Sequence, residues 1–213
     1  MRSHPDLEKL TNAAARRLLL LRAIADECTG PVTPESERKL AVVAIEAVNL
    51  WALFSRSFYL SCFLSGRRRS GSRVALSLAR IGNKRDAIRF SIQELKPKLK
   101  NKSSWRMREE PAWRRPDTLL KLFARGGASN LPQVQSAFGY STRVFEELPV
   151  LRNFYAHRNE ETAKLSVNVA RSLGVPSSSR PSEILSARLP GRPQNVLCDY
   201  LDDMRIVAEL LCE

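Results

Sequence analysis

The segment from Thr33 to Gly66 constrains the fold more than any other part of the sequence. Thr33 followed by Pro34 is typical of a helix N-cap and first turn. Apolar residues then recur at helical spacing, without a break, as far as Phe63. The pattern predicts a single helix of roughly 30 residues, in which residues 40–64 form the centre of an all-α bundle.

This long segment is also apolar enough to be considered as a membrane span. Glu46, Asn49 and Arg56 would then lie deep in hydrocarbon, where polar and charged side chains are costly. We therefore expect the buried central helix of a protein that does not enter a membrane. The residues after Met1 form no apolar export signal, so we expect a cytoplasmic protein with reduced cysteines.

Helical periodicity and turn signals divide the remaining sequence into shorter elements. Helices are expected over residues 6–27, 84–96, 117–124, 131–138, 149–156, 162–173 and 194–211. A short helical piece is expected between residues 73 and 84, and a turn or linker over residues 176–181. No stretch alternates with a period of two. We therefore expect an all-α helical bundle with two long N-terminal helices, forming one domain over residues 1–213.

The positive charge of the chain is concentrated in one region. The net charge is +13, yet residues 56–115 hold 17 Lys and Arg against four Asp and Glu, while the rest of the chain holds 18 of each. A regional excess of this kind is the expected footprint of phosphate binding. The alternative is a solvated surface with no ligand.

Two parts of the basic region are candidate RNA-binding segments. One is a predicted loop whose arginines would bind phosphates: Arg67, Arg68, Arg69 and Arg73. The other is a basic, irregular insert over residues 97–116, in which Trp105 and Trp113 could stack on unpaired bases. The alternative for these tryptophans is that both are buried anchors of the insert.

The sequence offers few groups for metal or cofactor chemistry. The four cysteines are far apart and form no C-x-x-C pair, and there are two histidines, His4 and His157. We expect neither a metal site nor a cofactor. Because His4 lies in the N-terminal tail, a histidine-based mechanism would use His157.

His157 closes a short motif, which reads Leu151-Arg152-Asn153-Phe154-Tyr155-Ala156-His157. The spacing R-x4-H, with Asn after the arginine, resembles the signature of the HEPN superfamily of helical domains. In a chain of this composition that extended motif would occur about 0.01 times by chance. The resemblance covers the motif and the general helical plan. Asn159 departs from the tyrosine of several toxin-like members, which argues against that subgroup and its tyrosine-modifying antitoxin.

The resemblance implies a metal-independent endoribonuclease, such as a toxin or antiviral defence effector, that acts on RNA as a homodimer and answers to a regulatory partner protein or antitoxin. His157 would exchange a proton with the ribose 2′-hydroxyl or the leaving oxygen, and Arg152 would neutralise the phosphate. Asn153 would either fix which ring nitrogen of His157 carries the proton or contact the second subunit of the dimer. Arg158 would either contact a phosphate or pair with a neighbouring acid.

Helix geometry favours a site shared between subunits. On a regular helix Leu151 and Tyr155 form one core stripe, and His157 lies on nearly the opposite side. Arg152 and His157 are five residues apart, which separates their directions by about 140°. One helix therefore cannot easily aim both at a single phosphate, and the resemblance implies the solution, a dimer in which Arg and His from two motifs form one site.

Two other functions remain open. A non-catalytic HEPN module that binds RNA or nucleotide shares all of these features, whereas a helical interaction protein that contacts acidic protein or nucleic acid would not need Arg152 with His157. Glu46, Asn49 and Arg56 also fall near one face of the long apolar helix. They either line the site or form an internal structural network, and the network is the favoured interpretation because buried polar groups need partners.

Overall fold

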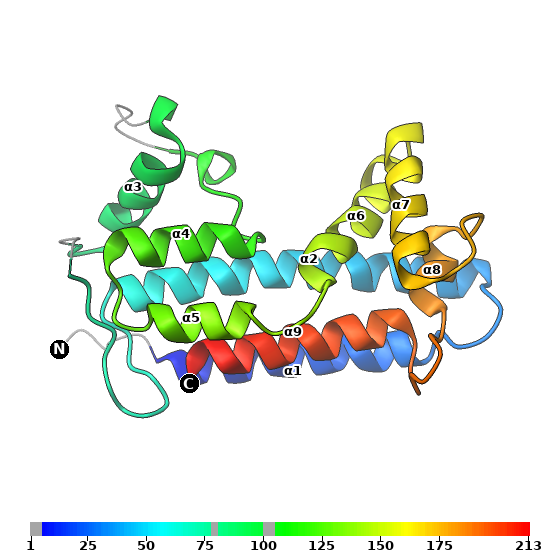
Figure 1. Ribbon diagram of the computed structural model, residues 1–213, viewed down its shortest axis with the longest axis horizontal. Coiled ribbons are helices and arrows are strands. Elements are labelled where there is room, and N and C mark those ends of the chain that lie inside the picture. The colour runs from blue at the N-terminus through cyan, green and yellow to red at the C-terminus, as the bar shows by residue number, and fades with distance from the viewer. Residues whose placement is uncertain (1–5, 78–80, 100–104) are drawn as a thin grey trace. The chain divides into compact units, whose positions relative to one another are not determined.

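The two long N-terminal helices begin and end close to where the sequence predicts. The computed structural model describes residues 6–77, 81–99 and 105–213, with α1 over Leu7–Asp26 and α2 over Pro34–Phe63 (Figure 1). Thr33 starts α2 as its N-cap. Its hydroxyl accepts the backbone N–H of Ser36 at 3.2 Å, and its carbonyl accepts the N–H of Glu37 at 2.9 Å.

Within the described ranges the chain forms nine α-helices and no strand, which confirms the all-α prediction. The remaining helices are α3 (Lys84–Leu95), α4 (Pro116–Gly126), α5 (Leu131–Phe138), α6 (Val144–His157), α7 (Glu160–Leu173), α8 (Pro181–Ser186) and α9 (Val196–Cys212). The expected insert contains two short 3-10 turns, Pro97–Leu99 and Met107–Glu109. Residues 100–104 of the insert lie outside the described ranges.

Helix α2 is long and apolar enough to cross a membrane by length and composition, and half of its most apolar stretch is buried within the protein. The same properties fit the core helix of a bundle. Leu40, Val43 and Ala47 are completely buried, whereas Val42 and Leu53 are exposed. The helix is therefore apolar on more than the face that it buries.

The chain divides into two compact units, which we describe separately. The first unit comprises the described part of Met1–Ala14 together with Trp51–Ser141 and Val207–Glu213. The second unit comprises Ala15–Leu50 and Thr142–Ile206. Helices α1, α2 and α9 each contribute residues to both units.

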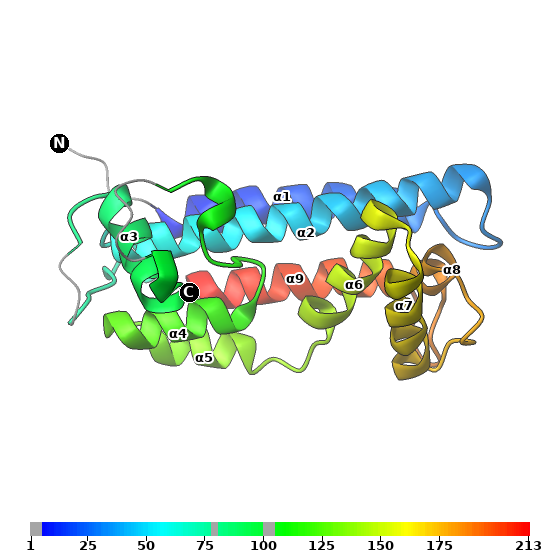
Figure 2. The ribbon, with the colours of Figure 1, turned by 90° about the horizontal axis from the view of Figure 1, so that it is seen from above.

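Aromatic side chains form the core of the first unit. Phe58 stacks on Phe123 with ring centroids 5.4 Å apart, and Tyr59 packs between Phe63 and Trp113 at 4.2 and 5.0 Å. Helices α4 and α5 pack against each other beside this core (Figure 2). Such pairs add to the hydrophobic gain of burying large rings, so this unit has a well-specified interior.

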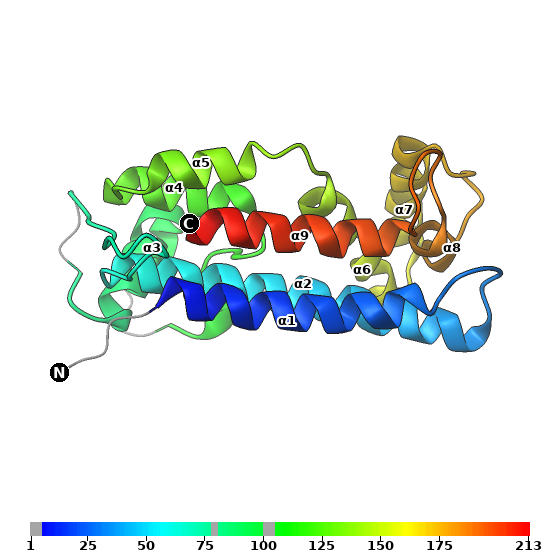
Figure 3. The same cartoon turned by 90° about the horizontal axis from the view of Figure 1, so that it is seen from below.

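Polar contacts connect the elements of the second unit. The N-terminal part of α9 lies beside the C-terminal part of α1 (Figure 3), where Arg22 forms an ion pair with Asp202 at 3.0 Å. Asn195, before α9, donates to the carbonyl of Ala25 at 2.9 Å. Helices α6 and α7 form a closely packed pair.

Three local predictions were wrong. Residues 74–77 form no helix, because their backbone pairs with residues 127–129; residues 78–80 lie outside the described ranges. Pro181 was assigned to a linker but opens α8, where Pro is favoured in the first turn. Pro149 was expected to open a helix, yet α6 begins five residues earlier and contains it.

Candidate functional site

Buried polar contacts fix α6, the helix that carries the motif. Thr142, just before the helix, donates to Asp203 at 2.6 Å and accepts the N–H of Val144 at 3.2 Å. Glu147 is 7% exposed, accepts a hydrogen bond from Ser172 of α7 at 2.6 Å, and accepts another from the hydroxyl of Tyr200 on α9. These contacts hold α6 in spite of Pro149, which cannot make the helical backbone bond at its position.

Helix α6 ends directly after the motif. Arg158 adopts the left-handed conformation (φ 42°) and its N–H donates to the carbonyl of Phe154 at 2.8 Å, which closes the helix. Asn159 then caps α7, because its side chain accepts the N–H of Thr162 at 2.9 Å. The chain therefore reverses within two residues, immediately beyond His157.

The motif residues lie on the faces that helix geometry predicts. Leu151 and Tyr155 are buried at 0% and 9% exposure, and His157, the last residue of α6, is exposed. His157 is therefore not a core histidine. Val150 and Phe154, expected on the histidine side, are partly exposed.

Within one chain, Arg152 and His157 do not converge. Arg152 is half-buried, and its Nε atom is buried without a hydrogen-bond partner among the described residues. Its Nη1 atom donates to Asn153 Oδ1 across 3.4 Å, a long contact. Asn153 is thus beside the arginine rather than the histidine, so within a single chain it does not hold the tautomer of His157 as was expected.

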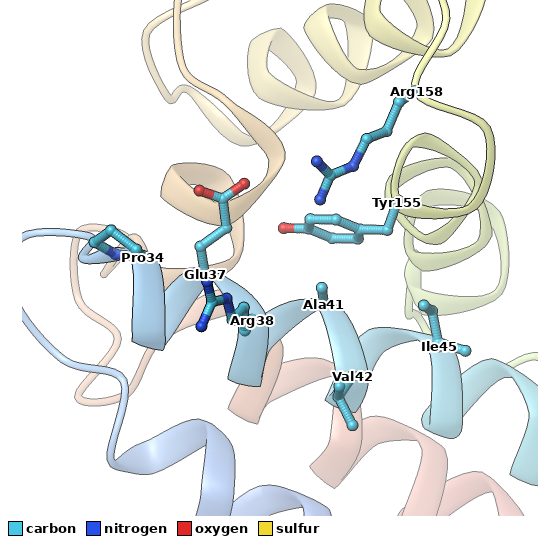
Figure 4. A pocket seen from close by; sticks show the side chains of 8 residues that line it. All are labelled: Pro34, Glu37, Arg38, Ala41, Val42, Ile45, Tyr155 and Arg158. Carbon is cyan, nitrogen blue, oxygen red and sulfur yellow. The ribbon is translucent and has the colours of Figure 1, made fainter.

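A groove of about 430 Å³ lies in the second unit between the first turns of α2 and the end of α6 (Figure 4). It is lined by Pro34, Glu37, Arg38, Ala41, Val42, Ile45, Tyr155 and Arg158. The Tyr155 hydroxyl points toward Glu37, and the guanidinium of Arg158 extends over the same space. The groove therefore adjoins the end of the motif.

The Tyr155 hydroxyl is the most buried polar group of the groove. It lies near the Ser182 hydroxyl, but neither hydroxyl makes a well-formed hydrogen bond within the described residues. Burial raises the pKa of Tyr155, and the charge of Glu37 raises it further, while Ser182 and Arg158 lower it. The hydroxyl therefore remains neutral at neutral pH and can both donate and accept.

The sequence analysis did not single out Glu37 and assigned Tyr155 to the core. Tyr155 is indeed buried, but its polar end reaches the groove. Glu37 is an acid one helical turn after the N-cap Thr33, but it stands among the charged residues Glu35, Arg38 and Lys39, so the sequence does not distinguish it. Its proximity to Tyr155 depends on tertiary packing, which no local pattern in the sequence records.

The predicted basic loop is a tight, ordered turn in the first unit. Arg67 and Arg73 form an antiparallel bridge, and the Arg68 N–H donates to the carbonyl of Ser72 at 2.8 Å. The Arg68 side chain donates to the Ser72 hydroxyl at 2.9 Å. Arg67, Arg69 and Arg73 are exposed, so the loop presents cations to solvent on a fixed backbone.

The two tryptophans of the insert have different environments. Trp113 is 7% exposed, packs on Tyr59 and donates to Glu110 at 2.8 Å. It cannot stack on a base, so the RNA-stacking assignment of Trp113 was wrong and the core-anchor alternative holds. Trp105 is partly exposed, and the guanidinium of Arg89 lies 5.8 Å from its ring centroid. Trp105 remains a candidate for base stacking.

Arg56, Glu46 and Asn49 do not form one cluster. Arg56 makes a bidentate ion pair with Glu110, at 2.6 Å from Nε and 2.8 Å from Nη2, within the first unit. Glu46 and Asn49 belong to the second unit and are exposed, so neither is part of a buried network. The structural-network interpretation therefore holds for Arg56 alone.

Among the described residues, no group of three or more His, Cys, Asp or Glu side chains could hold a metal ion. All four cysteines are buried and free. Comparison of the chain with protein-family models, with curated proteins and with solved structures finds no match. A functional assignment must therefore be argued from the motif and its surroundings.

Proposed function

We propose that this protein is a metal-independent endoribonuclease whose active site is built from Arg152 and His157 of two subunits. The observation that carries the proposal is the exposure of His157 at the end of α6, on the same helix as Arg152, whose buried Nε has no hydrogen-bond partner among the described residues. A structural histidine would be packed or hydrogen-bonded, whereas an exposed one is available to exchange protons. The resemblance of the extended R-x4-H motif to the HEPN signature supports the same function.

In the proposed reaction one His157 removes the proton of the ribose 2′-hydroxyl, and the 2′-oxygen attacks the adjacent phosphorus. The bond from phosphorus to the 5′-oxygen breaks, and the second His157 of the dimer protonates that leaving oxygen. The products are a 2′,3′-cyclic phosphate and a free 5′-hydroxyl. Arg152 stabilises the additional negative charge that develops on the phosphate oxygens.

The separation of Arg152 and His157 by about 140° around α6 supports a dimer, if both residues act on one phosphate. Partly exposed Val150 and Phe154 on the histidine side of the helix provide apolar surface for a second subunit. The same separation also favours a second candidate function, an RNA-binding module without cleavage. In a chain that stays monomeric, Arg152 would bind phosphate and His157 would have no catalytic partner.

The deciding experiment incubates the pure protein with mixed RNA in EDTA. We expect cleavage, cyclic phosphate ends and complete loss of activity in His157→Ala, with unfolding free energy unchanged to within about 0.5 kcal/mol because the side chain is exposed. Lys164→Ala is the matched control, since Lys164 is an exposed cation of α7. Activity that needs added magnesium contradicts the mechanism. RNA binding without cleavage supports the second candidate.

The shared site is tested by mixing Arg152→Ala protein with His157→Ala protein. If each site takes one arginine and one histidine from different subunits, a mixed dimer contains one intact site and activity partly returns. The proposed reaction uses both histidines at one phosphate, so we expect a site that needs all four residues: mixing restores nothing although both variants still dimerise. A strictly monomeric protein at concentrations where it cleaves RNA contradicts both forms of the dimer.

The loop of Arg67, Arg68 and Arg69 is proposed to bind RNA electrostatically. Each phosphate contact that is removed lowers the slope of log affinity against log salt by about 0.7 for a single strand. Replacing the three arginines with serine should therefore weaken binding across RNA sequences and flatten the salt dependence. An unchanged slope identifies the loop as a solvated surface.

A further inference from the structure

The groove between α2 and α6 contains polar groups that the protein itself does not satisfy. Neither the Glu37 carboxylate nor the Arg158 guanidinium has a hydrogen bond or ion pair within the described part of the chain. The Tyr155 side chain is 9% exposed, and its hydroxyl lies near the Ser182 hydroxyl without a well-formed hydrogen bond in that part of the chain. The Tyr155 hydroxyl is buried, Glu37 is half-buried and Arg158 is exposed, so a buried hydroxyl beside two unpaired opposite charges along one groove indicates a ligand.

The other side chains of the groove are suited to a flat, partly apolar ligand. Ala41, Val42 and Ile45 supply an apolar wall from successive turns of α2. The volume of about 430 Å³ lies within the range of small-molecule clefts, about 300 to 1,000 Å³. A nucleobase, with apolar faces and a polar edge, matches a groove with one apolar wall and polar groups at its end.

We propose that this groove binds a nucleoside and selects guanosine. Its role as a subsite in RNA cleavage rests on the proposed ribonuclease function. The Glu37 carboxylate is an acceptor with two oxygens. Guanine presents two adjacent donors on its Watson–Crick edge, N1–H and the N2 amino group, which a carboxylate accepts in a bidentate manner. Adenine, cytosine and uracil each place at least one acceptor there, which the negative charge of Glu37 repels.

The remaining groups of the groove complete the recognition of a guanosine phosphate. The Tyr155 hydroxyl, which points toward Glu37, is a donor for the guanine O6 oxygen. Arg158 is a cation for the attached phosphate and follows His157 directly in the chain. A guanosine in the groove therefore adjoins the histidine that is proposed to act on the scissile phosphate.

Binding is tested with the four nucleoside 3′-monophosphates, by isothermal titration calorimetry on the full chain. We expect guanosine 3′-monophosphate to bind tightest, and Glu37→Gln to weaken it by about 5- to 150-fold, the range for loss of a bidentate base contact. Glu35→Gln is the matched control, because Glu35 is an exposed acid of the same turn that pairs with Lys39. Equal binding of all four nucleotides by the wild type overturns the proposal without any variant.

The phosphate contact is tested separately. Arg158→Ala should weaken guanosine 3′-monophosphate but leave the affinity for guanosine, which has no phosphate, unchanged to within about twofold. Arg17→Ala is the control, an exposed arginine of α1 outside the groove. Equal loss of both ligands in Arg158→Ala contradicts the assigned role of the guanidinium.

Cleavage-site mapping distinguishes failure of this inference from failure of the proposed function. Cleavage next to guanosine that becomes indifferent to the base in Glu37→Gln supports both. Cleavage without base preference is consistent with the proposed ribonuclease but contradicts the groove as a subsite for the RNA substrate. This holds even if free guanosine 3′-monophosphate still binds through Glu37. Guanosine-selective binding without any cleavage supports the groove and contradicts the ribonuclease.

Discussion

The two units of this protein use arginine, glutamate and a large aromatic side chain in opposite ways. In the first unit, Arg56 and Glu110 make a bidentate ion pair, and Trp113 donates to the same carboxylate. In the groove of the second unit, Arg158 and Glu37 make no ion pair, and the Tyr155 hydroxyl has no hydrogen bond among the described residues. The same kinds of side chain are paired with one another around Glu110 in the first unit and are not paired with one another in the groove of the second.

This difference separates residues that maintain structure from residues that are available to a ligand. The Lys96 ammonium donates to the Glu110 backbone carbonyl at 2.7 Å, so both the side chain and the backbone of Glu110 hold the insert in place. Removing part of such a network leaves buried groups without partners. Changing Glu37 or Arg158 removes no hydrogen bond or ion pair of its side chain within the described residues. Mutations in the Glu110 network should therefore affect stability, and mutations of Glu37 or Arg158 should affect ligand binding.

The largest effect is expected for Trp113→Ala. Its buried ring packs on Tyr59, so truncation should lower the free energy of unfolding by about 3 to 5 kcal/mol, as for other large aromatic residues in cores. Trp105→Ala should lower it by about 1 kcal/mol or less, because that ring is partly exposed and makes a cation–π contact. Urea unfolding measures both. Equal losses contradict the different environments of the two rings.

The next effect concerns the two glutamates. Glu110→Ala should lower the free energy of unfolding by about 2 to 3 kcal/mol, somewhat less than for a fully buried pair because Arg56 is 27% exposed. Glu37→Ala should change it by less than about 0.5 kcal/mol. Thermal and urea unfolding of the two variants test the comparison directly. A large loss in Glu37→Ala would mean that the groove glutamate is structural.

A smaller, pH-dependent effect is expected in both units. Burial raises the pKa of Cys212 in the first unit to about 12 and that of Cys198 in the second to about 11, from an ordinary value of 9.0. The neutral thiol is favoured in the fold, so stability is fully present below pH 9 and falls as the pH rises toward 11 and 12. Urea unfolding between pH 8 and 11 measures this loss. Cys198→Ala and Cys212→Ala should each make the decline less steep.

The smallest effect has the opposite sign. Arg158 has a positive φ of 42°, a conformation that costs a residue with a Cβ atom about 1 kcal/mol relative to glycine. Arg158→Gly should therefore raise the free energy of unfolding by up to about 1 kcal/mol while weakening nucleotide binding. Differential scanning calorimetry with parallel titration measures the two quantities. Destabilisation would show that the arginine side chain contributes to folding.

Much of the fold could be predicted because helices leave local signals. Thr33, Pro34 and the apolar spacing of the following residues defined α2, and the helix expected over residues 84–96 is α3, Lys84–Leu95. Pro149 misled because proline usually opens a helix, whereas here contacts through Glu147 to other helices keep it inside α6. These contacts between helices outweigh the preference of proline for the first turn of a helix, and no local sequence pattern indicates them.

The candidate site was predictable only in part. The exposure of His157 followed from its angular position relative to the core stripe of Leu151 and Tyr155. The burial of Trp113 could not be derived, because a tryptophan in a basic segment without apolar periodicity fits either a core or a surface. The groove required Glu37 and Tyr155, over a hundred positions apart in the sequence, to be brought together by folding.

The division of the chain also bears on how this protein can evolve. The backbone passes between the units four times, after Ala14, Leu50, Ser141 and Ile206, and three of these passages fall inside helices. Neither unit is encoded by one continuous stretch of the gene, so exchange of a single continuous segment cannot replace one unit and leave the other intact.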